Sequence, residues 1–451
     1  MIKSGPGFDR AGRLAIWLVV ILLGGPVLAQ ATTNSRLSFS HLIAGLDSTF
    51  VAKFNYGRGI FEHQWSRSTH PDGTATGLGP FYNGVGCAQC HVRDGRGQPP
   101  GPDAPAISGF VMQLGVPVAA NGPQTPDPRY GLQLQEQATA GVLPEGRITI
   151  TYDDVPMQLG DTTVQLRSPN YEIVDLGYGP LAPDVRLGPR IAPPIFGLGF
   201  VAAIDADDII ANADEFDADG DGISGRANFV TDKASGALVL GRFGWKASAP
   251  SIRAQAERAA ALDMGLSSPA HGDPDGDCMP GQGICEAEGS ERPELDEQSV
   301  RLIEFYVSHL AIPASRDLQS IGAVAGREVF EAIGCAACHV PEFVTTGEDE
   351  VFKGKQIRPY SDFLLHDMGP DLADGITVGR ASEAEWRTAP LWAIGLSAAV
   401  SGRETYLHDG RARTLSEAIL WHGGEAAGAR ARFQGLSEGA RQVLLEFIAA
   451  I

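Results

Sequence analysis

The chain has 451 residues, a formal net charge of -20 and six cysteines. This length is enough for two or three ordinary domains, each with its own hydrophobic core. The acidic balance argues against nucleic acid and anionic lipid as partners and favours a protein with a basic or complementary surface. The 56 glycines and 30 prolines indicate long ordered loops wrapped around a central group rather than regular layers.

Residues 1–31 have the pattern of a secretory signal peptide. Basic residues precede an apolar run from Leu14 to Leu23, and small residues then lead to an exit at Ala29 or Ala31. An uncleaved anchor is the alternative, but the apolar run is short for a membrane span. We therefore expect cleavage, a periplasmic location and no stable membrane anchor.

The pattern Cys-x-x-Cys-His occurs twice and is typical of covalent haem c attachment. Two thiols three positions apart reach both vinyl groups of one porphyrin, and the adjacent imidazole reaches the iron. A zinc ribbon would want its two cysteine pairs closer together, and a thioredoxin-like redox pair needs no adjacent histidine. The sequence therefore predicts two covalently bound haem c groups. The first haem motif consists of Cys87, Cys90 and His91, and the second consists of Cys335, Cys338 and His339.

The first half of the chain offers few other iron ligands. His63 and His70 precede the first haem motif, and each is either a distal ligand or an ordinary loop histidine. No histidine occurs from Val92 to Ala270. The first iron is therefore expected to be open on one side or ligated from upstream. Residues 100–185 are predicted as short antiparallel strands that decorate the first domain.

An acidic loop at residues 217–228 resembles the first half of a calcium-binding loop. Asp217, Asp219 and Asp221 stand at alternate positions, but Asn228 replaces the usual acidic residue at the twelfth position. The loop predicts either a calcium site completed from elsewhere in the chain or a solvated acidic turn. Beyond this loop, Cys278 and Cys285 are spare cysteines, and in an exported protein they are candidates for a disulfide.

The end of the first half and the second half have helical patterns. A helix with a buried face is expected from Glu297 to Leu310, with His309 as a packed residue rather than a ligand. Pro313 ends this helix and opens the next domain. Further amphipathic helices are expected over Leu415–His422 and Ser437–Ile451.

The two halves also echo each other in sequence. Arg190–Gly199 in the first half matches Arg387–Leu396 in the second, and each segment lies downstream of its own haem motif. The predicted fold is mainly α with long loops and a few short antiparallel strands, arranged as two fused cytochrome c-type domains. The expected domains are residues 32–312, which include the calcium-type loop, and residues 313–451.

With these motifs, the phrases Leu365–Gly369 and Tyr406–Leu415 resemble the di-haem oxidoreductase family. That family is related to the bacterial di-haem cytochrome c peroxidases and to the di-haem maturation enzyme of methylamine dehydrogenase. The resemblance covers nearly all of the mature chain. It implies a peroxidase-like enzyme in which the first haem reacts with peroxide or another small substrate and the second transfers electrons. A small cytochrome or a cupredoxin would be the redox partner, and a non-catalytic electron carrier with both irons six-coordinate is the alternative.

The resemblance also implies roles for individual residues. In the peroxidases, the distal ligand of the electron-transfer haem follows a His-Asp-Gly element, and that position is His422 in this chain. Met368, in a loop after the second haem motif, is the rival ligand. The residues nearest to the peroxidase active site are Trp245 as a bridge between haems, Gln255 to hold peroxide and Asp263 to move its proton. A buried tryptophan followed by a polar helix is the alternative interpretation of the last three.

Overall fold

The structure is a computed structural model, and the predicted signal peptide and His70 lie outside the residues that it describes. Among the described residues, no helix is long and apolar enough to cross a membrane. The described ranges are residues 36–69, 75–101, 108–118, 124–273, 275–285 and 293–451.

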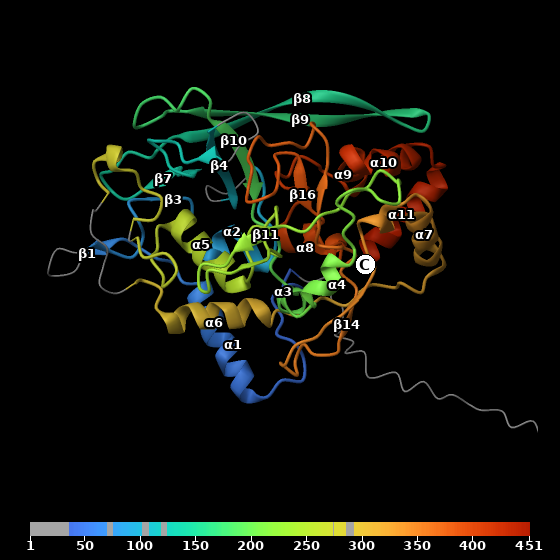
Figure 1. The fold of residues 1–451 in the computed structure, drawn as a ribbon, viewed down its shortest axis with the longest axis horizontal. Helices are drawn as coiled ribbons and strands as arrows, with labels where there is room; N and C mark the ends of the chain where they lie inside the picture. The colour runs from blue at the N-terminus through green and yellow to red at the C-terminus, as the bar shows by residue number, and fades with distance from the viewer. Residues whose placement is uncertain (1–35, 70–74, 102–107, 119–123, 274, 286–292) are drawn as a thin grey trace, which may run out of the picture.

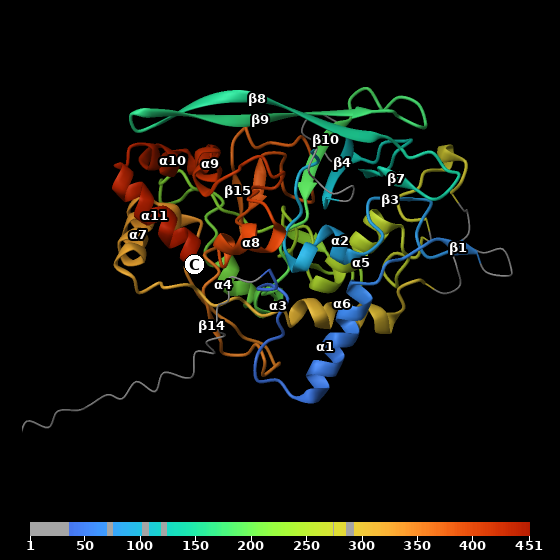
Figure 2. The ribbon, with the colours of Figure 1, turned by 180° about the vertical axis from the view of Figure 1, so that it is seen from behind.

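Helices and short turns alternate with strands along the chain (Figures 1 and 2). The helices are α1 (Ser48–Phe61), α2 (Cys87–Cys90), α3 (Leu198–Ala202), α4 (Ala206–Ile210), α5 (Ile252–Met264), α6 (Glu297–Ser308), α7 (Ile321–Ala332), α8 (Ser397–Ser401), α9 (Leu415–Leu420), α10 (Ala427–Gln434) and α11 (Glu438–Ala450). Single 3-10 turns are η1 (Val92–Asp94), η2 (Pro280–Gln282), η3 (Cys335–Ala337), η4 (Ile394–Leu396) and η5 (Gly424–Ala426).

The strands pair in antiparallel sheets, most of them two-stranded. They are β1 (Ser68–Thr69), β2 (Ala75–Thr76), β3 (Phe81–Tyr82), β4 (Phe110–Pro117), β5 (Gln124–Thr125), β6 (Gln133–Leu134), β7 (Gln137–Ala138), β8 (Arg147–Leu159), β9 (Thr162–Val174), β10 (Arg186–Ile191), β11 (Phe229–Thr231), β12 (Leu238–Leu240), β13 (Phe343–Val344), β14 (Gln356–Ile357), β15 (Leu365–Asp367) and β16 (Glu385–Arg387).

The prediction of a mainly α fold is wrong. Helices account for 29% of the protein and strands for 21%, with many antiparallel sheets. The physical reason is that the stretches rich in glycine and proline do not all remain loops. Many of them pair as hairpins, because paired strands satisfy the hydrogen-bonding groups of their backbone.

A long hairpin formed by β8 and β9 is the largest difference from the prediction. Each strand has 13 residues, and a two-residue turn that contains Gly160 joins them. Gly160 has a φ of 59°, as a tight hairpin turn requires. The hairpin runs along one side of the molecule, from the β4–β10 sheet to α10 (Figure 1). At the α10 end, the Gly160 backbone N–H donates to the Gln434 carbonyl at 2.9 Å.

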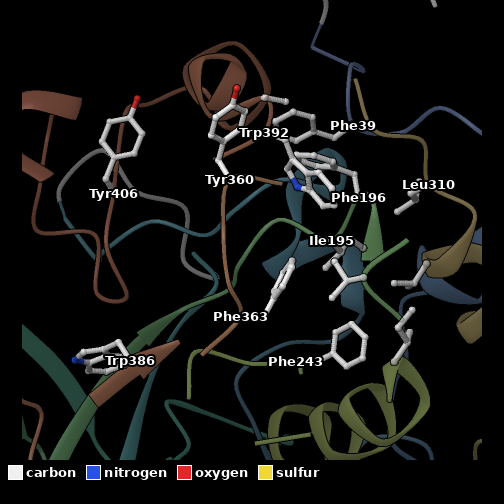
Figure 3. Close-up of a cluster of buried hydrophobic side chains, with 14 of the residues drawn as sticks. Phe39, Ile195, Phe196, Phe243, Leu310, Tyr360, Phe363, Trp386, Trp392 and Tyr406 are labelled. Atoms are coloured by element: carbon white, nitrogen blue, oxygen red, sulfur yellow. The ribbon is translucent and has the colours of Figure 1, made fainter. Parts of the chain in front are cut away.

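The largest hydrophobic core runs through both halves of the chain and includes residues from Phe39 to Ile451. Figure 3 shows part of it, where Phe196 of the first half lies beside Trp392 of the second with ring centroids 6.4 Å apart. Two separate cytochrome domains are therefore not shown, because residues from both predicted domains bury their apolar surface together.

Several local predictions agree with the structure. Helix α6 corresponds to the helix expected from Glu297, and α11 to the helix expected from Ser437. His309 is a packed residue, 4% exposed and stacked on Phe305 with 3.8 Å between ring centroids. Cys278 and Cys285 form a disulfide.

The helix predicted over Leu415–His422 is shorter than expected. Helix α9 ends at Leu420, so His422 lies just beyond it rather than on it.

Candidate functional site

Both haem motifs line one central cavity of about 740 Å³. All four motif cysteines and both motif histidines contribute to its wall. The fold thus brings two motifs from opposite halves of the sequence to one place.

The first haem motif forms the single turn of α2, with His91 at its end. The Nδ1 atom of His91 lies 2.8 Å from the Pro193 carbonyl oxygen. A carbonyl only accepts hydrogen bonds, so Nδ1 carries the proton and Nε2 is free to bind iron. Burial lowers the pKa of His91 to about 4, so the imidazole is neutral, as an iron ligand must be.

The second haem motif repeats this geometry on the turn η3. The Nδ1 atom of His339 lies 2.8 Å from the Tyr360 carbonyl oxygen, which again leaves Nε2 free. Burial, together with the nearby His422, lowers the pKa of His339 to about 4. Both motif histidines are therefore oriented by a backbone carbonyl and presented in the form that binds iron.

The charges around the cavity fit the propionates of haem. Arg96 is buried, its Nε atom has no hydrogen-bond partner among the described residues, and burial lowers its pKa to about 10. Although the protein is acidic, basic side chains outnumber acidic ones in the cavity wall, and such a wall would pair with the propionates of two haem groups. The basic residues are Arg96, Arg190, Arg242, Lys246, Arg258, Arg387, Arg430 and Arg432, and the acidic ones are Asp221, Glu257, Asp263 and Glu425.

Both candidate distal ligands of the second haem reach the cavity. The Nδ1 atom of His422 lies 2.7 Å from the Ala418 carbonyl, so its Nε2 atom is free to bind iron. Met368 lies in a loop that packs closely against Gly423. A Cβ atom added to Gly423 would come within 2.7 Å of the Met368 carbonyl oxygen, so only glycine fits there without a shift. The choice between the two ligands stays a prediction.

Of the two predicted upstream ligands of the first haem, His63 is the one that the structure describes. His63 is exposed and packs edge-on against Trp65, with ring centroids 4.9 Å apart. It does not line the cavity. His70 lies outside the described residues.

Sequence reasoning missed two histidines that line the cavity, His366 and His408. His366 lies between Asp362 at 2.8 Å and Glu425 at 2.7 Å. Burial lowers its pKa, but hydrogen bonds to Asp362, Cys338 and Glu425 outweigh this and raise the pKa to about 12. The imidazole is therefore a buried cation beside the second haem motif. Its place within the phrase Leu365–Gly369 was the only sequence signal for it.

His408 is stacked on Trp386, with 3.7 Å between ring centroids. Its Nε2 atom has no hydrogen-bond partner among the described residues, and burial lowers its pKa to about 3. His408 is therefore neutral. It belongs to the His-Asp-Gly element, which the sequence analysis used only to locate His422.

The three predicted catalytic residues all line the cavity. The indole Nε1 of Trp245 donates to the Ile191 carbonyl at 2.8 Å. Gln255 and Asp263 lie near opposite ends of α5. Burial raises the pKa of Asp263 to about 6. Burial, and to a smaller extent the charge of Asp263, raises the pKa of the two thiols of the first haem motif. The three residues thus share the wall of one large cavity, while their roles stay predictions.

The predicted calcium ligands are only partly brought together. Ligand atoms of Asp214, Asp217 and Asp219 lie within 4.8 Å of one another, whereas Asp221 is not part of this group. Asp221 instead accepts a hydrogen bond from the Ile223 backbone N–H at 2.8 Å. Calcium binding stays a prediction.

A search of curated proteins found no match for this chain. A family model described as "Di-haem oxidoreductase, putative peroxidase" matches residues 20–107 and 175–451. The segment between these ranges lies outside the match. Because the matched ranges make up most of the sequence, the chain belongs to the di-haem oxidoreductase family, whose name implies two haem groups in one protein.

Proposed function

We propose that the protein is a periplasmic, peroxidase-like di-haem c oxidoreductase. One observation carries the proposal: both Cys-x-x-Cys-His motifs line a single cavity, and each motif histidine uses Nδ1 on a backbone carbonyl, which would leave Nε2 for a haem iron. The haem groups, attached through the motif cysteines, would supply one iron that meets peroxide or another small substrate and one that transfers electrons. Family membership supports the oxidoreductase class.

Gln255 and Asp263 would handle the substrate at the first haem. The amide of Gln255 would hold peroxide by hydrogen bonds. The carboxylate of Asp263 would accept a proton from one peroxide oxygen and return it to the oxygen that leaves as water. Burial raises the pKa of Asp263 to about 6, which suits proton transfer near neutral pH.

Trp245 and His422 would serve the electron path. Trp245 would bridge the two haems, and its anchored indole in the wall of the shared cavity supports this role. His422 would be the distal ligand of the second haem, which would then have a lower potential than with a thioether ligand. A small cytochrome or a cupredoxin would exchange electrons with this haem.

The alternative function, a non-catalytic electron carrier, requires two six-coordinate irons. Electron paramagnetic resonance of the ferric protein distinguishes the two functions. We expect one high-spin haem whose signal and absorption change when peroxide is added. Two low-spin haems in every redox state would contradict an enzyme.

The role of Asp263 has a separate test. The variant Asp263→Asn keeps the size of the side chain and an acceptor oxygen but cannot carry the proton. We expect peroxide reduction to fall about 100- to 10,000-fold, the usual contribution of a general acid or base. The matched control is Asp161→Asn in the exposed turn of the β8–β9 hairpin, which should keep full activity. An unchanged rate in Asp263→Asn would contradict the role.

A further inference from the structure

The segment 108–174, which the family model does not match, contributes to the cavity wall. It carries β4 to β9 and was predicted as a decoration of the first domain. Three of its side chains, Val111, Gln113 and Gln133, nevertheless line the cavity. The insertion therefore reaches the site itself.

Gln133 makes the most specific contact of this segment. Its Nε2 atom donates to Oδ1 of Asp263 at 2.7 Å, across 130 positions of sequence. Gln133 is 2% exposed, so water does not compete for this hydrogen bond. The amide therefore restricts the orientation of the carboxylate that projects into the cavity.

The backbone around Gln133 is fixed on several sides. Its N–H donates to Oδ2 of Asp277, beside the disulfide, at 2.9 Å, and it pairs with Gln113 of β4. Two positions further on, the side chain of Gln135 donates to the Leu262 carbonyl at 2.6 Å. The insertion thus holds the last turn of α5 through two glutamines, of which only Gln133 bonds to the carboxylate.

We propose that Gln133 is a positioning residue for Asp263. Its amide holds one carboxylate oxygen, so that the other faces the substrate for proton transfer. This inference rests on the proposed function, in which Asp263 moves the proton of peroxide. Gln133 lies in the segment that the family model does not match. The orientation of Asp263 at the first haem would therefore depend on this insertion.

The charged groups around Asp263 give the proposal a measurable consequence. Burial raises the pKa of the carboxyl to about 6, while the hydrogen bond from Gln133 and the charge of Arg258, on the same helix, hold it down. Asp277 faces Arg258 from the disulfide loop, and the first-motif cysteines face Asp263 from α2. Loss of the Gln133 amide removes a contribution that stabilises the charged carboxylate, so the pKa rises further.

The test compares Gln133→Met with Gln135→Met in the haem-loaded protein. Both changes keep the length of a buried side chain and remove an amide donor, but only the first removes a bond to the carboxylate. Infrared difference spectroscopy would follow protonation of Asp263, identified by the carboxyl band that Asp263→Asn lacks. In Gln133→Met we expect the midpoint to rise by about one pH unit, the size expected for a hydrogen bond to a charged group. The acid limb of kcat/KM for peroxide should move by the same amount.

The outcomes separate the inference from the function. An unchanged infrared midpoint in Gln133→Met would overturn the positioning role, and so would an equal shift in Gln135→Met, which would indicate a general structural effect. If the midpoint shifts in Gln133→Met alone while Asp263→Asn keeps full peroxide reduction, Gln133 still holds the carboxylate. In that case it is the proton-transfer role of Asp263 that fails.

Discussion

The histidines of the two haem motifs are held in the same way, but the residues around the two motifs differ. Each motif histidine has its Nδ1 atom 2.8 Å from a backbone carbonyl, Pro193 in one case and Tyr360 in the other. Around the second motif lie two further imidazoles, His366 and His422. Near the first lie the carboxyl of Asp263 and the Gln133 amide that donates to it. Under the proposed function, identical attachment motifs would hold one iron for electron transfer and another for chemistry, because the rest of the fold decides what faces each haem.

The largest expected effect concerns attachment itself, where the two motifs should behave alike. Replacing Cys87 and Cys90 by alanine, or Cys335 and Cys338 by alanine, should remove one covalent haem per pair, since each thioether needs its thiol. Haem staining and the mass of the mature protein measure this. A double variant that keeps two covalent haems would show that the motif does not attach haem.

The control for attachment is the third cysteine pair. Replacing Cys278 and Cys285 by alanine should leave both haems attached, because these two cysteines form a disulfide with each other and neither lines the cavity. Loss of haem in this variant would indicate that folding, and not thioether chemistry, limits attachment.

The next largest effect should separate the two haems. His422→Ala should convert the second haem from low-spin to high-spin, because its distal ligand is lost, and should leave the first haem unchanged. Electron paramagnetic resonance measures this, and the near-infrared band typical of a methionine-ligated ferric haem should be absent from the parent protein. If Met368→Ala produces the change and His422→Ala does not, methionine is the ligand.

Features encoded by short sequence patterns could be predicted, whereas contacts between residues far apart in the sequence could not. The haem motifs and helices such as α6 and α11 can be recognised from short patterns of neighbouring residues. The structure contains both of these predicted helices. The residues Trp245, Gln255 and Asp263 were found through a family resemblance, and they do share the cavity. The resemblance was therefore enough to name three residues of the cavity wall, while their roles stay predictions.

The contacts that complete the site could not be predicted in the same way. Gln133 and Asp263 are 130 positions apart, and nothing in the pattern of either segment refers to the other. His366 gains its charge from Asp362 and Glu425, and the second of these lies 59 positions away. The long hairpin had a local signal, Gly160 and Asp161 between two β-rich runs, but its strands were predicted as short fragments.

The hairpin contacts the His-Asp-Gly element, which gives a third prediction of smaller size. The Tyr171 hydroxyl donates to Oδ2 of Asp409 at 2.8 Å. Tyr171→Phe keeps the ring and removes a hydrogen bond to a buried charge, so the free energy of unfolding should fall by about 1.5–3 kcal/mol. Chemical denaturation measures this. Tyr152→Phe, on the same hairpin, is the control and should change stability little, since no hydrogen bond of the Tyr152 hydroxyl is found among the described residues. Equal losses in both variants would contradict the assignment.

The same contact predicts the pH dependence of stability. Burial raises the pKa of Asp409, but the charge of Arg411 and the hydrogen bonds from Arg411 and Tyr171 outweigh this and hold the pKa below its usual value. The folded pKa therefore lies below the unfolded value of about 3.9. The stabilisation from Asp409 is present above the unfolded pKa and is lost as the pH falls through the folded one. The effect of Tyr171→Phe should thus be full at neutral pH and shrink below about pH 4.

The smallest expected effect concerns the acidic loop, which lies on the side of the second haem. Its Ser224 hydroxyl donates to Glu425 at 2.9 Å, and Glu425 in turn contacts His366. We expect millimolar calcium to stabilise the protein by about 1 kcal/mol, as weak extracellular sites do, because it relieves the repulsion between Asp214, Asp217 and Asp219.

Thermal unfolding with calcium and with a chelator would measure this stabilisation, and Asp217→Asn should abolish the difference. If calcium binding in the loop affects the second haem through Glu425, chelation should also alter the spectrum of that haem. The spectrum of the first haem should stay unchanged. Identical unfolding and spectra under both conditions would reduce the loop to a solvated acidic turn. The asymmetry between the haems would then depend on the buried residues alone.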